Sequence, residues 1–275
     1  MRRLLRFTAI SLGTGSTVLG LSLLGYYFIN TPKTPATNTT AASFVHLEIQ
    51  TDGVLPAPWI EFRMALEENL GLMQIDMSGV KAILETYPQI KAASVERKFP
   101  KTLCVRVQER FPVFRMKVKE ASGESVVLLV DEEGFVFKNI RYPDRLINRL
   151  PYLAGVDLHR TVDGYVPIQG VACLAELFHV ARTNFPDLAR EWRVVYADQL
   201  IMAKSFTKGY IRVRSRGVKE ILFSPKNFEK QLEKLQYILD SHGGPSVSYI
   251  TRVNLSLLDQ PTVEFANNFH PDTYH

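Results

Sequence analysis

An unbroken apolar run near the N-terminus is the strongest pattern in the chain. No charged residue occurs from Phe7 to Pro32, and the stretch Thr8–Ile29 is rich in Leu, Ile, Val, Gly and Phe. A helix of roughly 22 residues rises about 33 Å, which is enough to cross the ~30 Å hydrocarbon layer of a bilayer. The pattern therefore predicts one transmembrane helix over residues 8–29.

The residues on either side of this run predict its orientation. An arm over residues 1–7 carries Arg2, Arg3 and Arg6 and no acidic residue, and aromatic rings at 26–28 end the run. Because positive residues favour the cytoplasmic side, we expect a cytoplasmic N-terminus and an extracytoplasmic remainder. The alternative is a cleavable signal peptide, but its apolar core is usually shorter and ends in small residues.

Two polar segments are expected to remain outside any folded unit. Residues 30–43 consist mainly of Thr, Pro, Ala and Asn and offer little to bury, so they predict an extended tether. Residues 266–275 are polar and predict a C-terminal tail. The folded part is therefore expected between residues 44 and 265.

The period of the apolar positions changes twice between residues 44 and 110. Alternation over Phe44–Ile49 predicts a strand, followed by a turn at Asp52-Gly53. A helix opened by Pro56 and Pro58 and capped by Gly71 is expected next. Its apolar residues, at spacings of three and four, are Trp59, Phe62, Leu66 and Leu70.

A second helix and two strands complete this first unit. The helix begins near Asp76 or Ser78 and stops before Pro88. The residues on its apolar face are Val80, Ile83, Leu84 and Tyr87. Strands are expected at Ile90–Arg97 and Leu103–Glu109, so the predicted order is strand, helix, helix, strand, strand.

Residues 111–265 predict a second unit that is rich in strands. The expected strands are Phe111–Lys119, Ser125–Val130, Phe135–Lys138, Glu191–Ala197, Leu200–Ser205, Tyr210–Ser215, Val218–Phe223, Tyr249–Ser256 and Pro261–Phe265. Amphipathic helices are expected at Ile168–Phe185 and Pro225–Ser241. The acidic run Asp131–Gly134 is interpreted as a hairpin turn rather than a metal or acid–base site.

A basic stripe in this unit has two interpretations. Arg212, Arg214 and Arg216 alternate with Ile211 and Val213. This alternation is typical of a half-buried strand with charged residues on its outer face. Binding to anionic lipid or to an acidic partner is the alternative.

The overall charge does not point to a nucleic-acid partner. The formal net charge is +5, and without the three arginines of the arm the chain carries 33 − 3 = 30 basic and 28 acidic residues. A nearly neutral body offers no broad electrostatic attraction for nucleic acid.

Motifs for catalysis are absent from the sequence. There is no Gly-x-Ser-x-Gly elbow, phosphate-binding glycine loop or His-Glu-x-x-His pair, and the run 241–244 is interpreted as a helix end. Cys104 and Cys173 lack the spacing of a metal site, although a single disulfide between them stays possible. We therefore expect a non-enzymatic protein with no catalytic, metal-binding or cofactor-binding residue and no small-molecule substrate.

Residues 44–110 resemble the POTRA domain of the FtsQ/DivIB cell-division proteins. The positions that carry the resemblance are Ile75-Asp76, Val80, Leu84, Pro88, Ile90, Ala93, Val95, Arg97, Phe99-Pro100, Leu103, Val105, Val107, Glu109-Arg110 and Pro112-Val113. Within this set we expect Glu109 and Arg110 to be a solvated charge pair.

The resemblance extends in weaker form to the second unit. Leu150–Gly155 is similar to a family segment that precedes a helix, and Val253 and Leu255 match a strand near the end. Asn254 and the pair 256–257 depart from the family's usual residues there. The implied fold class is α+β: a transmembrane helix, a β-α-α-β-β POTRA domain at 44–110, and a β domain at 111–265 with an antiparallel sheet and two flanking helices.

The resemblance implies a site and a role. In this family the last strands form an open sheet edge to which the FtsB partner adds a strand. The candidate contact residues by position are Arg252, Leu255, Leu257, Val263 and Phe265. The implied role is a scaffold in the inner membrane at the division septum, which links early and late division proteins and assembles with FtsB-like and FtsL-like partners.

Two other functions were considered for an anchored protein of this kind. A translocation or secretion component with a POTRA domain usually carries tandem POTRA repeats and a membrane barrel, and neither is apparent in the sequence. A membrane-anchored hydrolase of the cell envelope is the other alternative.

Overall fold

The computed structural model describes residues 45–67, 70–120, 123–162, 164–199, 209–257 and 260–266. The expected cytoplasmic arm, transmembrane helix, most of the tether, the strand Leu200–Ser205 and nearly all of the C-terminal tail lie outside the described residues. Among the helices that are described, none combines the length and the apolar character needed to cross a membrane.

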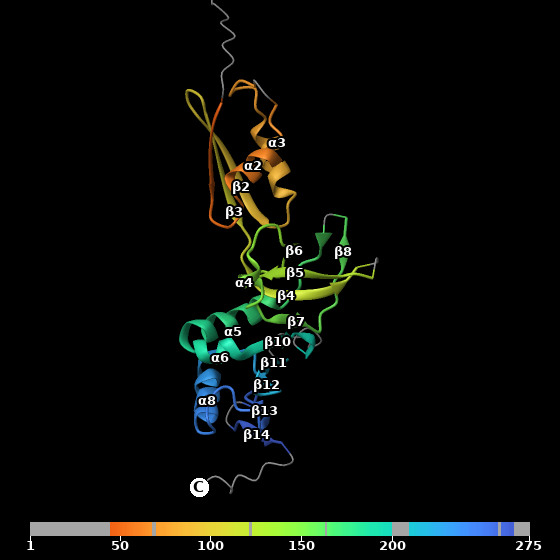
Figure 1. The fold of residues 1–275 in the computed structure, drawn as a ribbon, viewed down its shortest axis with the longest axis vertical. Helices are drawn as coiled ribbons and strands as arrows, with labels where there is room; N and C mark the ends of the chain where they lie inside the picture. Colours follow the sequence, from red (N-terminus) through yellow and green to blue (C-terminus); the bar gives the residue numbers. More distant parts are fainter. Residues whose placement is uncertain are drawn as a thin grey trace, which may run out of the picture. The chain divides into compact units, whose positions relative to one another are not determined.

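The first unit has the predicted order of elements. They are β1 (His46–Thr51), α2 (Ala57–Met64), α3 (Met77–Glu85), β2 (Ile90–Lys98) and β3 (Thr102–Glu109). The strands form a sheet in the order β1-β3-β2, with β1 parallel and β2 antiparallel to β3. Both helices lie on one face of this sheet, as Figure 1 shows. Their buried residues meet Leu103, Val105 and Val107 of the central strand.

Helix α3 begins as its sequence predicts, but its predicted apolar face is only partly buried, since Ile83 is 40% exposed. The Asp76 carboxylate accepts a hydrogen bond from the Ser78 N–H at 3.0 Å, which satisfies a donor at the helix start. Val80 and Leu84, four residues apart, are both buried. Local signals determined this helix because its cap and its apolar face lie within nine residues.

Helix α2 differs from its prediction in both length and face. It ends at Met64, because Ala65 adopts a left-handed conformation with φ 49°, and Gly71 is not its cap. Ile60 and Met64 are buried on the sheet side, whereas 76% of Phe62 is exposed. The predicted apolar face was wrong at Phe62; Trp59 packs on the core from the helix, and Leu66 and Leu70 do so from the segment after it.

The second unit is built on a nine-stranded sheet with the order β14-β13-β12-β11-β10-β7-β4-β5-β6. Its strands are β4 (Pro112–Lys119), β5 (Ser125–Asp131), β6 (Val136–Lys138), β7 (Tyr152–Ala154), β10 (Trp192–Tyr196), β11 (Ile211–Ser215), β12 (Glu220–Phe223), β13 (Ile250–Asn254) and β14 (Thr262–Phe265). Its helices are α4 (Asp144–Ile147), α5 (Val171–Asn184), α6 (Pro186–Glu191) and α8 (Phe228–Asp240). A separate short hairpin pairs β8 (Arg160–Thr161) with β9 (Gly164–Tyr165).

The expectation of an antiparallel sheet was wrong in part, because the sheet is mixed. Strand β7 is parallel to both β4 and β10, and β12 is parallel to β13. The Leu150–Gly155 segment precedes helix α5, as expected, with the short β8 and β9 in between. Its centre forms β7, which lies between β4 and β10 in the sheet. The connection from β12 to β13 passes through α8, as a parallel pair requires a crossover.

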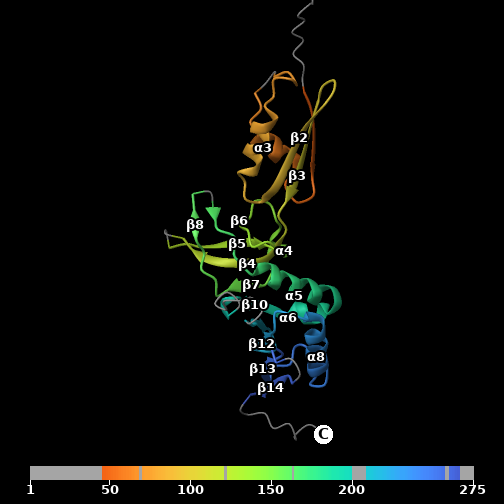
Figure 2. The same ribbon diagram turned by 180° about the vertical axis from the view of Figure 1, so that it is seen from behind.

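Helices α5 and α8 cover one face of the sheet. Figure 2, from behind, shows α8 again beside β12, β13 and β14. The buried residues of α5 are the predicted ones: Val171, Leu174, Leu177, Phe178 and Ala181. Edge-to-face rings join this helix to the sheet, with Phe178 centred 5.1 Å from Phe114 and 4.8 Å from Trp192.

Glu109 and Arg110 are not the solvated charge pair that was expected. Glu109 is 2% exposed and accepts hydrogen bonds from Thr51 Oγ1, Leu55 N–H and Gln89 Nε2. Arg110 instead binds Asp131 at 2.7 Å. The two side chains diverge because successive residues of an extended segment point to opposite sides.

The acidic run at the β5–β6 connection is a turn, as predicted. Asp131 Oδ1 accepts hydrogen bonds from the Glu133 and Phe135 N–H groups, at 3.0 and 2.8 Å. Its other oxygen binds Arg110, whose guanidinium lies 3.6 Å from the centre of the Phe135 ring. The carboxylate therefore shapes the turn and neutralises a buried cation.

Candidate functional site

Strand β14 forms one edge of the nine-stranded sheet. It pairs with β13 in antiparallel register, with Val263 opposite Val253 and Thr262 opposite Asn254. Ala266 donates its N–H to Tyr249 O at 2.8 Å, toward the β13 side. Because backbone groups alternate in direction along a strand, Val263, three residues earlier, directs its N–H away from β13.

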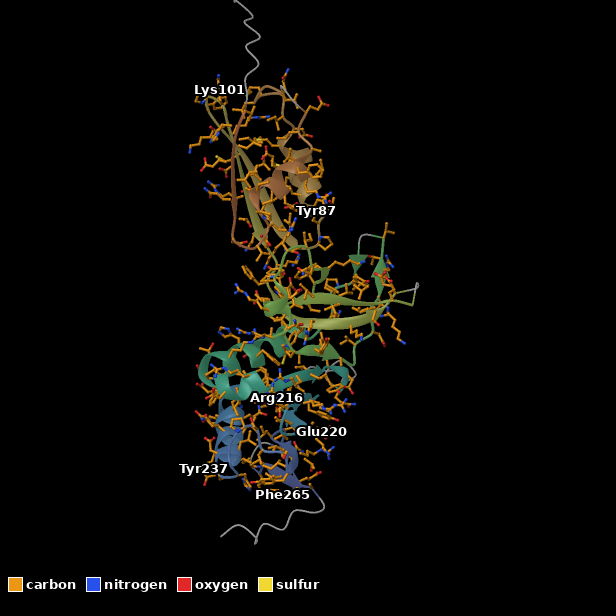
Figure 3. All side chains as sticks on the ribbon, viewed as in Figure 1. Tyr87, Lys101, Arg216, Glu220, Tyr237 and Phe265 are labelled. Atoms are coloured by element: carbon orange, nitrogen blue, oxygen red, sulfur yellow. The ribbon has the colours of Figure 1, made fainter. Side chains whose placement is uncertain are left out.

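A row of alternating charges crosses the sheet face away from α8 and ends at this edge. Arg212 on β11 lies between Asp198, at 3.3 Å, and Glu220 on β12, at 3.7 Å. Arg252 on β13 binds Glu220 and also Glu264 on β14, the latter at 3.2 Å. We call these five residues the charge ladder. Figure 3 labels Glu220 on this outer side of the sheet and Tyr237 on α8 at the opposite side.

From Glu220 outward, the charge ladder becomes more exposed toward the edge. Side-chain exposure is 21% for Glu220, 42% for Arg252 and 57% for Glu264. Hydrogen bonds from Arg252 to Glu220 first and Glu264 second raise the pKa of the guanidinium. The inner charges are thus neutralised within the sheet, while the last carboxylate stands at the border where another strand would pair.

The opposite face of the same edge is apolar. Val263 and Phe265 are partly buried against the core under α8. The Phe265 ring stacks on Tyr249 at 6.3 Å and lies 5.6 Å from the ring of His242. Tyr249 in turn donates its hydroxyl to His242 O at 2.6 Å, so the end of β14 is attached to the end of α8.

The five residues predicted for partner contact all lie in this region, but they differ in how exposed they are. Arg252, Val263 and Phe265 lie on the last two strands, and Leu257 is 52% exposed just after β13. Leu255 is 3% exposed, and its N–H donates to Leu222 O at 2.8 Å. Its side chain therefore belongs to the core and supports β13 from within.

The departures from the family pattern after β13 form a local turn. Asn254 Oδ1 accepts hydrogen bonds from the Ser256 N–H at 3.0 Å and from its hydroxyl at 2.6 Å. An aspartate at this position would offer the same acceptor, so the amide keeps that part of its geometry. The exposed Leu257 follows directly from this turn.

Sequence reasoning missed the acidic members of the charge ladder. Asp198, Glu220 and Glu264 are isolated in the sequence and lie on three separate segments. The alternation of Val263 and Phe265 with polar residues was a signal that Glu264 faces outward. Which residue binds Glu264, however, depends on the β13–β14 register. Of the basic stripe, Arg212 is paired with acidic residues across the sheet face.

The described ranges also bear on metal and disulfide chemistry. There, no group of three or more His, Cys, Asp and Glu residues is placed to hold a metal ion. Cys104 and Cys173 are both free thiols, so the possible disulfide is not formed.

Comparisons with known proteins agree with the architecture. Residues 44–110 match the family model described as POTRA domain, FtsQ-type. The chain is 30% identical over 166 residues to the cell division protein FtsQ of Myxococcus fulvus, covering 60% of this chain and 51% of that protein. It is 25% identical over 185 residues to FtsQ of Agrobacterium fabrum, covering 60% and 55%.

A third relative matches over a shorter stretch. FtsQ of Syntrophotalea carbinolica is 31% identical over 93 residues, which is 34% of this chain and 30% of that protein. The chain thus spans about half the length, or less, of the curated relatives it matches. Residues 44–110 thus match an FtsQ-type POTRA domain, and the three relatives to which the chain is similar are all FtsQ cell division proteins, which supports the resemblance to the FtsQ/DivIB family.

Proposed function

We propose that this protein is a non-enzymatic scaffold of the division machinery that captures an FtsB-like partner by strand addition at β14. The observation that carries the proposal is the edge position of β14, with the Val263 N–H directed away from β13. An edge strand offers backbone donors and acceptors to an incoming strand, and its side chains then select the sequence.

The two faces of the edge define the chemistry of the partner strand. Beside Val263 and Phe265 the added strand needs apolar side chains, because these residues continue the core under α8. On the other face it needs a basic side chain beside Glu264, which continues the alternation of the charge ladder. A strand that alternates apolar and basic residues meets both requirements.

The edge is held in place before any partner arrives. Arg252 binds Glu264, and the Thr251 hydroxyl donates to Glu264 O at 3.0 Å. The contact between Phe265 and Tyr249 fixes the end of the strand. A preorganised edge loses less conformational entropy when the partner pairs with it, which favours binding.

The sharpest test replaces single residues of β14 by proline. Val263→Pro removes an N–H directed to the open side, so we expect loss of partner capture while β14 stays paired with β13. Glu264→Pro is the matched variant, because its N–H is directed toward β13 and its loss disrupts the edge itself. Val263→Thr keeps both the N–H and the β-branched shape, and we expect it to retain capture.

The measurement is co-purification of the co-expressed FtsB-like partner with the full chain, together with the thermal unfolding midpoint of each variant. Full capture by a folded Val263→Pro variant would show that the partner does not pair with this edge. Loss of capture by Val263→Thr as strongly as by Val263→Pro would also refute strand addition.

The wider role rests on the family and on the expected membrane anchor. We propose that residues 8–29 hold the protein in the inner membrane and that the POTRA unit recruits it to the division site, so that it links early and late division proteins. Depletion should produce long, undivided cells, and a topology reporter fused after Ser43 should be active outside the cytoplasm. Normal cell length after depletion, or a cytoplasmic reporter signal, would contradict this role.

A further inference from the structure

A cavity lined by arginines lies in the second unit, away from the β14 edge. Its volume is about 970 Å³, and it lies between the segment that includes α4 and residues 148–151 on one side and α5, α6 and the start of β10 on the other. Its cationic lining residues are Arg145, Arg149, Arg182, Arg190 and Arg193. No aspartate or glutamate is among its described lining residues. Strand β10 and strand β14 are separated by three strands in the sheet order.

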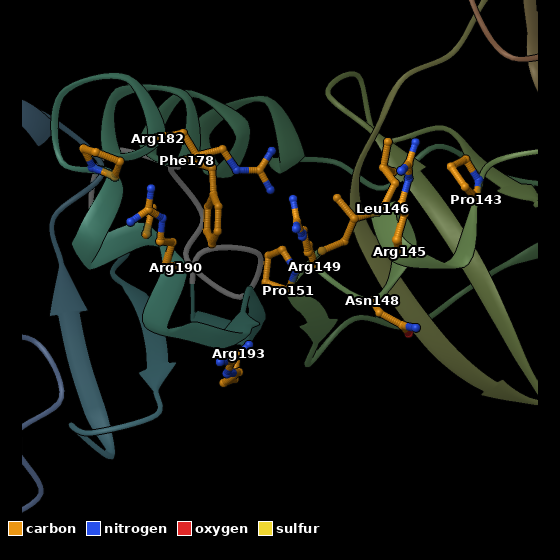
Figure 4. Close-up of a pocket in the computed structure, with 13 residues that line it drawn as sticks. Pro143, Arg145, Leu146, Asn148, Arg149, Pro151, Phe178, Arg182, Arg190 and Arg193 are labelled. Carbon is orange, nitrogen blue, oxygen red and sulfur yellow. The ribbon is translucent and has the colours of Figure 1, made fainter.

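Two of these arginines point into the same space. Figure 4 shows the guanidinium groups of Arg149 and Arg182 directed toward each other above Pro151 and Phe178. Arg193 points away at the lower rim. Arg190 is the one whose charge is balanced by a neighbouring acid, because it binds Asp187 at 2.7 Å.

Arg149 and Arg182 have no anionic partner within the described part of the chain. Neither guanidinium takes part in a hydrogen bond or an ion pair there, and the ring of Phe178, 5.8 Å from Arg182, is an uncharged neighbour. Desolvation lowers the pKa of Arg182, although Arg182 and Arg149 are both exposed residues. Two like charges directed at one another in a partly desolvated space repel, and an anion between them would remove that cost.

The residues that line the cavity indicate which class of anion fits it. Leu146, which is 36% exposed, provides apolar surface in the lining, where the buried Phe178, Leu150 and Pro151 also lie. Guanidinium groups bind phosphate through paired N–H donors, and two of them match an anion that carries more than one negative charge. A volume near 970 Å³ is large for a single phosphate and is in the range of sites that hold whole ligands.

We propose that this cavity binds a phosphate ester, with its phosphate or diphosphate group between Arg149 and Arg182 and its apolar portion beside Leu146. The ligand has one chemistry and two possible sources: a soluble phosphate compound or the headgroup of an anionic phospholipid. The site is independent of strand addition at β14 and adds a ligand-binding function to the second unit.

The test uses the purified full chain in detergent and two probes. Sodium pyrophosphate is titrated by calorimetry at constant ionic strength, and phosphatidylglycerol retention is compared with that of phosphatidylcholine by native mass spectrometry. Arg149→Gln/Arg182→Gln should weaken binding at least tenfold. The matched control Arg214→Gln/Lys230→Gln removes the same charge from exposed positions outside the cavity and should change binding less than twofold.

Each outcome decides for or against the site. Weaker binding in the cavity variant alone supports the site. Binding of pyrophosphate indicates the soluble source, and selective retention of phosphatidylglycerol indicates the lipid source. Absence of binding to both probes, equal weakening in the control, or tighter binding of polyglutamate than of pyrophosphate would overturn it. The cavity variant should unfold at the same temperature as the parent or higher, since a repulsion is removed; a lower midpoint would mean that the arginines are structural instead.

Discussion

Arg252 and Glu264 are bound to each other across the last two strands of the sheet, with Arg252 Nη1 3.2 Å from Glu264 Oε1. The same guanidinium binds Glu220 on β12, so one side chain connects three neighbouring strands. This connection holds the outermost strand where a partner is proposed to pair.

Replacing Arg252 by Gln should loosen β14 while the rest of the sheet stays folded. The variant removes the cation that binds Glu220 on β12 and Glu264 on β14 across the intervening β13, so β14 loses its ion pair with the rest of the sheet. Hydrogen exchange at the Ala266 amide should become several times faster, while exchange in β11 stays unchanged. Equal acceleration in both strands would show that Arg252 acts on the whole unit rather than on the edge.

Leu255 and Leu257 should respond in opposite ways to truncation. Leu255→Ala removes a side chain that is 3% exposed and should lower the free energy of unfolding by about 3 kcal/mol in urea titration. Leu257→Ala, at a position that is 52% exposed, should change it by less than about 0.5 kcal/mol. Only Leu257→Ala is expected to weaken partner capture without a change in stability, and capture unaffected by it would remove Leu257 from the proposed contact set.

Glu109→Ala should destabilise the POTRA domain. The carboxylate accepts from Thr51 Oγ1 and Leu55 N–H, each at 2.7 Å, and from Gln89 Nε2 at 3.0 Å. Buried donors left without an acceptor should cost about 3 kcal/mol in the free energy of unfolding. Glu96→Ala is the control, because this exposed residue binds only the exposed Arg106, and its change should stay below about 0.5 kcal/mol. Similar losses from both variants would contradict the special role of Glu109.

Gly134 and Gly123 form a matched pair for a test of close packing. Both have positive φ, at 89° and 86°, but a Cβ on Gly134 would lie 2.2 Å from Ile168 O, whereas one on Gly123 would meet nothing within 4 Å. Gly123→Ala should cost about 1 kcal/mol for the backbone conformation alone. Gly134→Ala should cost about 3 kcal/mol, because steric overlap is added. Thermal unfolding of both variants measures the difference, and equal costs would mean that the contact relaxes freely.

Cys173 should react slowly with alkylating reagents. Burial raises the pKa of its thiol from the ordinary value of 9.0 to about 11. At pH 8 a thiol with that pKa is ionised in about one molecule in a thousand, and only the thiolate reacts. Because folding favours the neutral thiol, its contribution to stability is complete below pH 9 and is lost as the pH rises toward 11.

Iodoacetamide labelling of a Cys104→Ser variant between pH 7 and pH 11 measures this shift. The folded chain should reach half its maximal rate near pH 11, and the same chain unfolded in urea should do so near pH 9. Coinciding midpoints would contradict the partial burial of Cys173.

The features that the sequence predicted well are those whose causes lie close together along the chain. Asp76 caps α3 two residues before Ser78, and the buried face of α5 repeats within fourteen residues. Strand alternation located β3, β11 and β12, because a half-buried strand shows its two faces in consecutive residues. The POTRA order of elements followed from these local signals together with the family resemblance.

Tertiary structure alone decided the features that depend on distant neighbours. The left-handed Ala65 ended α2 before its predicted cap, and β7 entered the sheet between β4 and β10, which made the sheet mixed. The charge ladder depends on strand register, and Arg149 and Arg182 line one cavity only because the segment after α4 and helix α5 both border it. Periodicity along the chain indicates which face of a segment is buried. Which strands are neighbours and which charges lie together are determined by contacts between segments. No single segment carries that information.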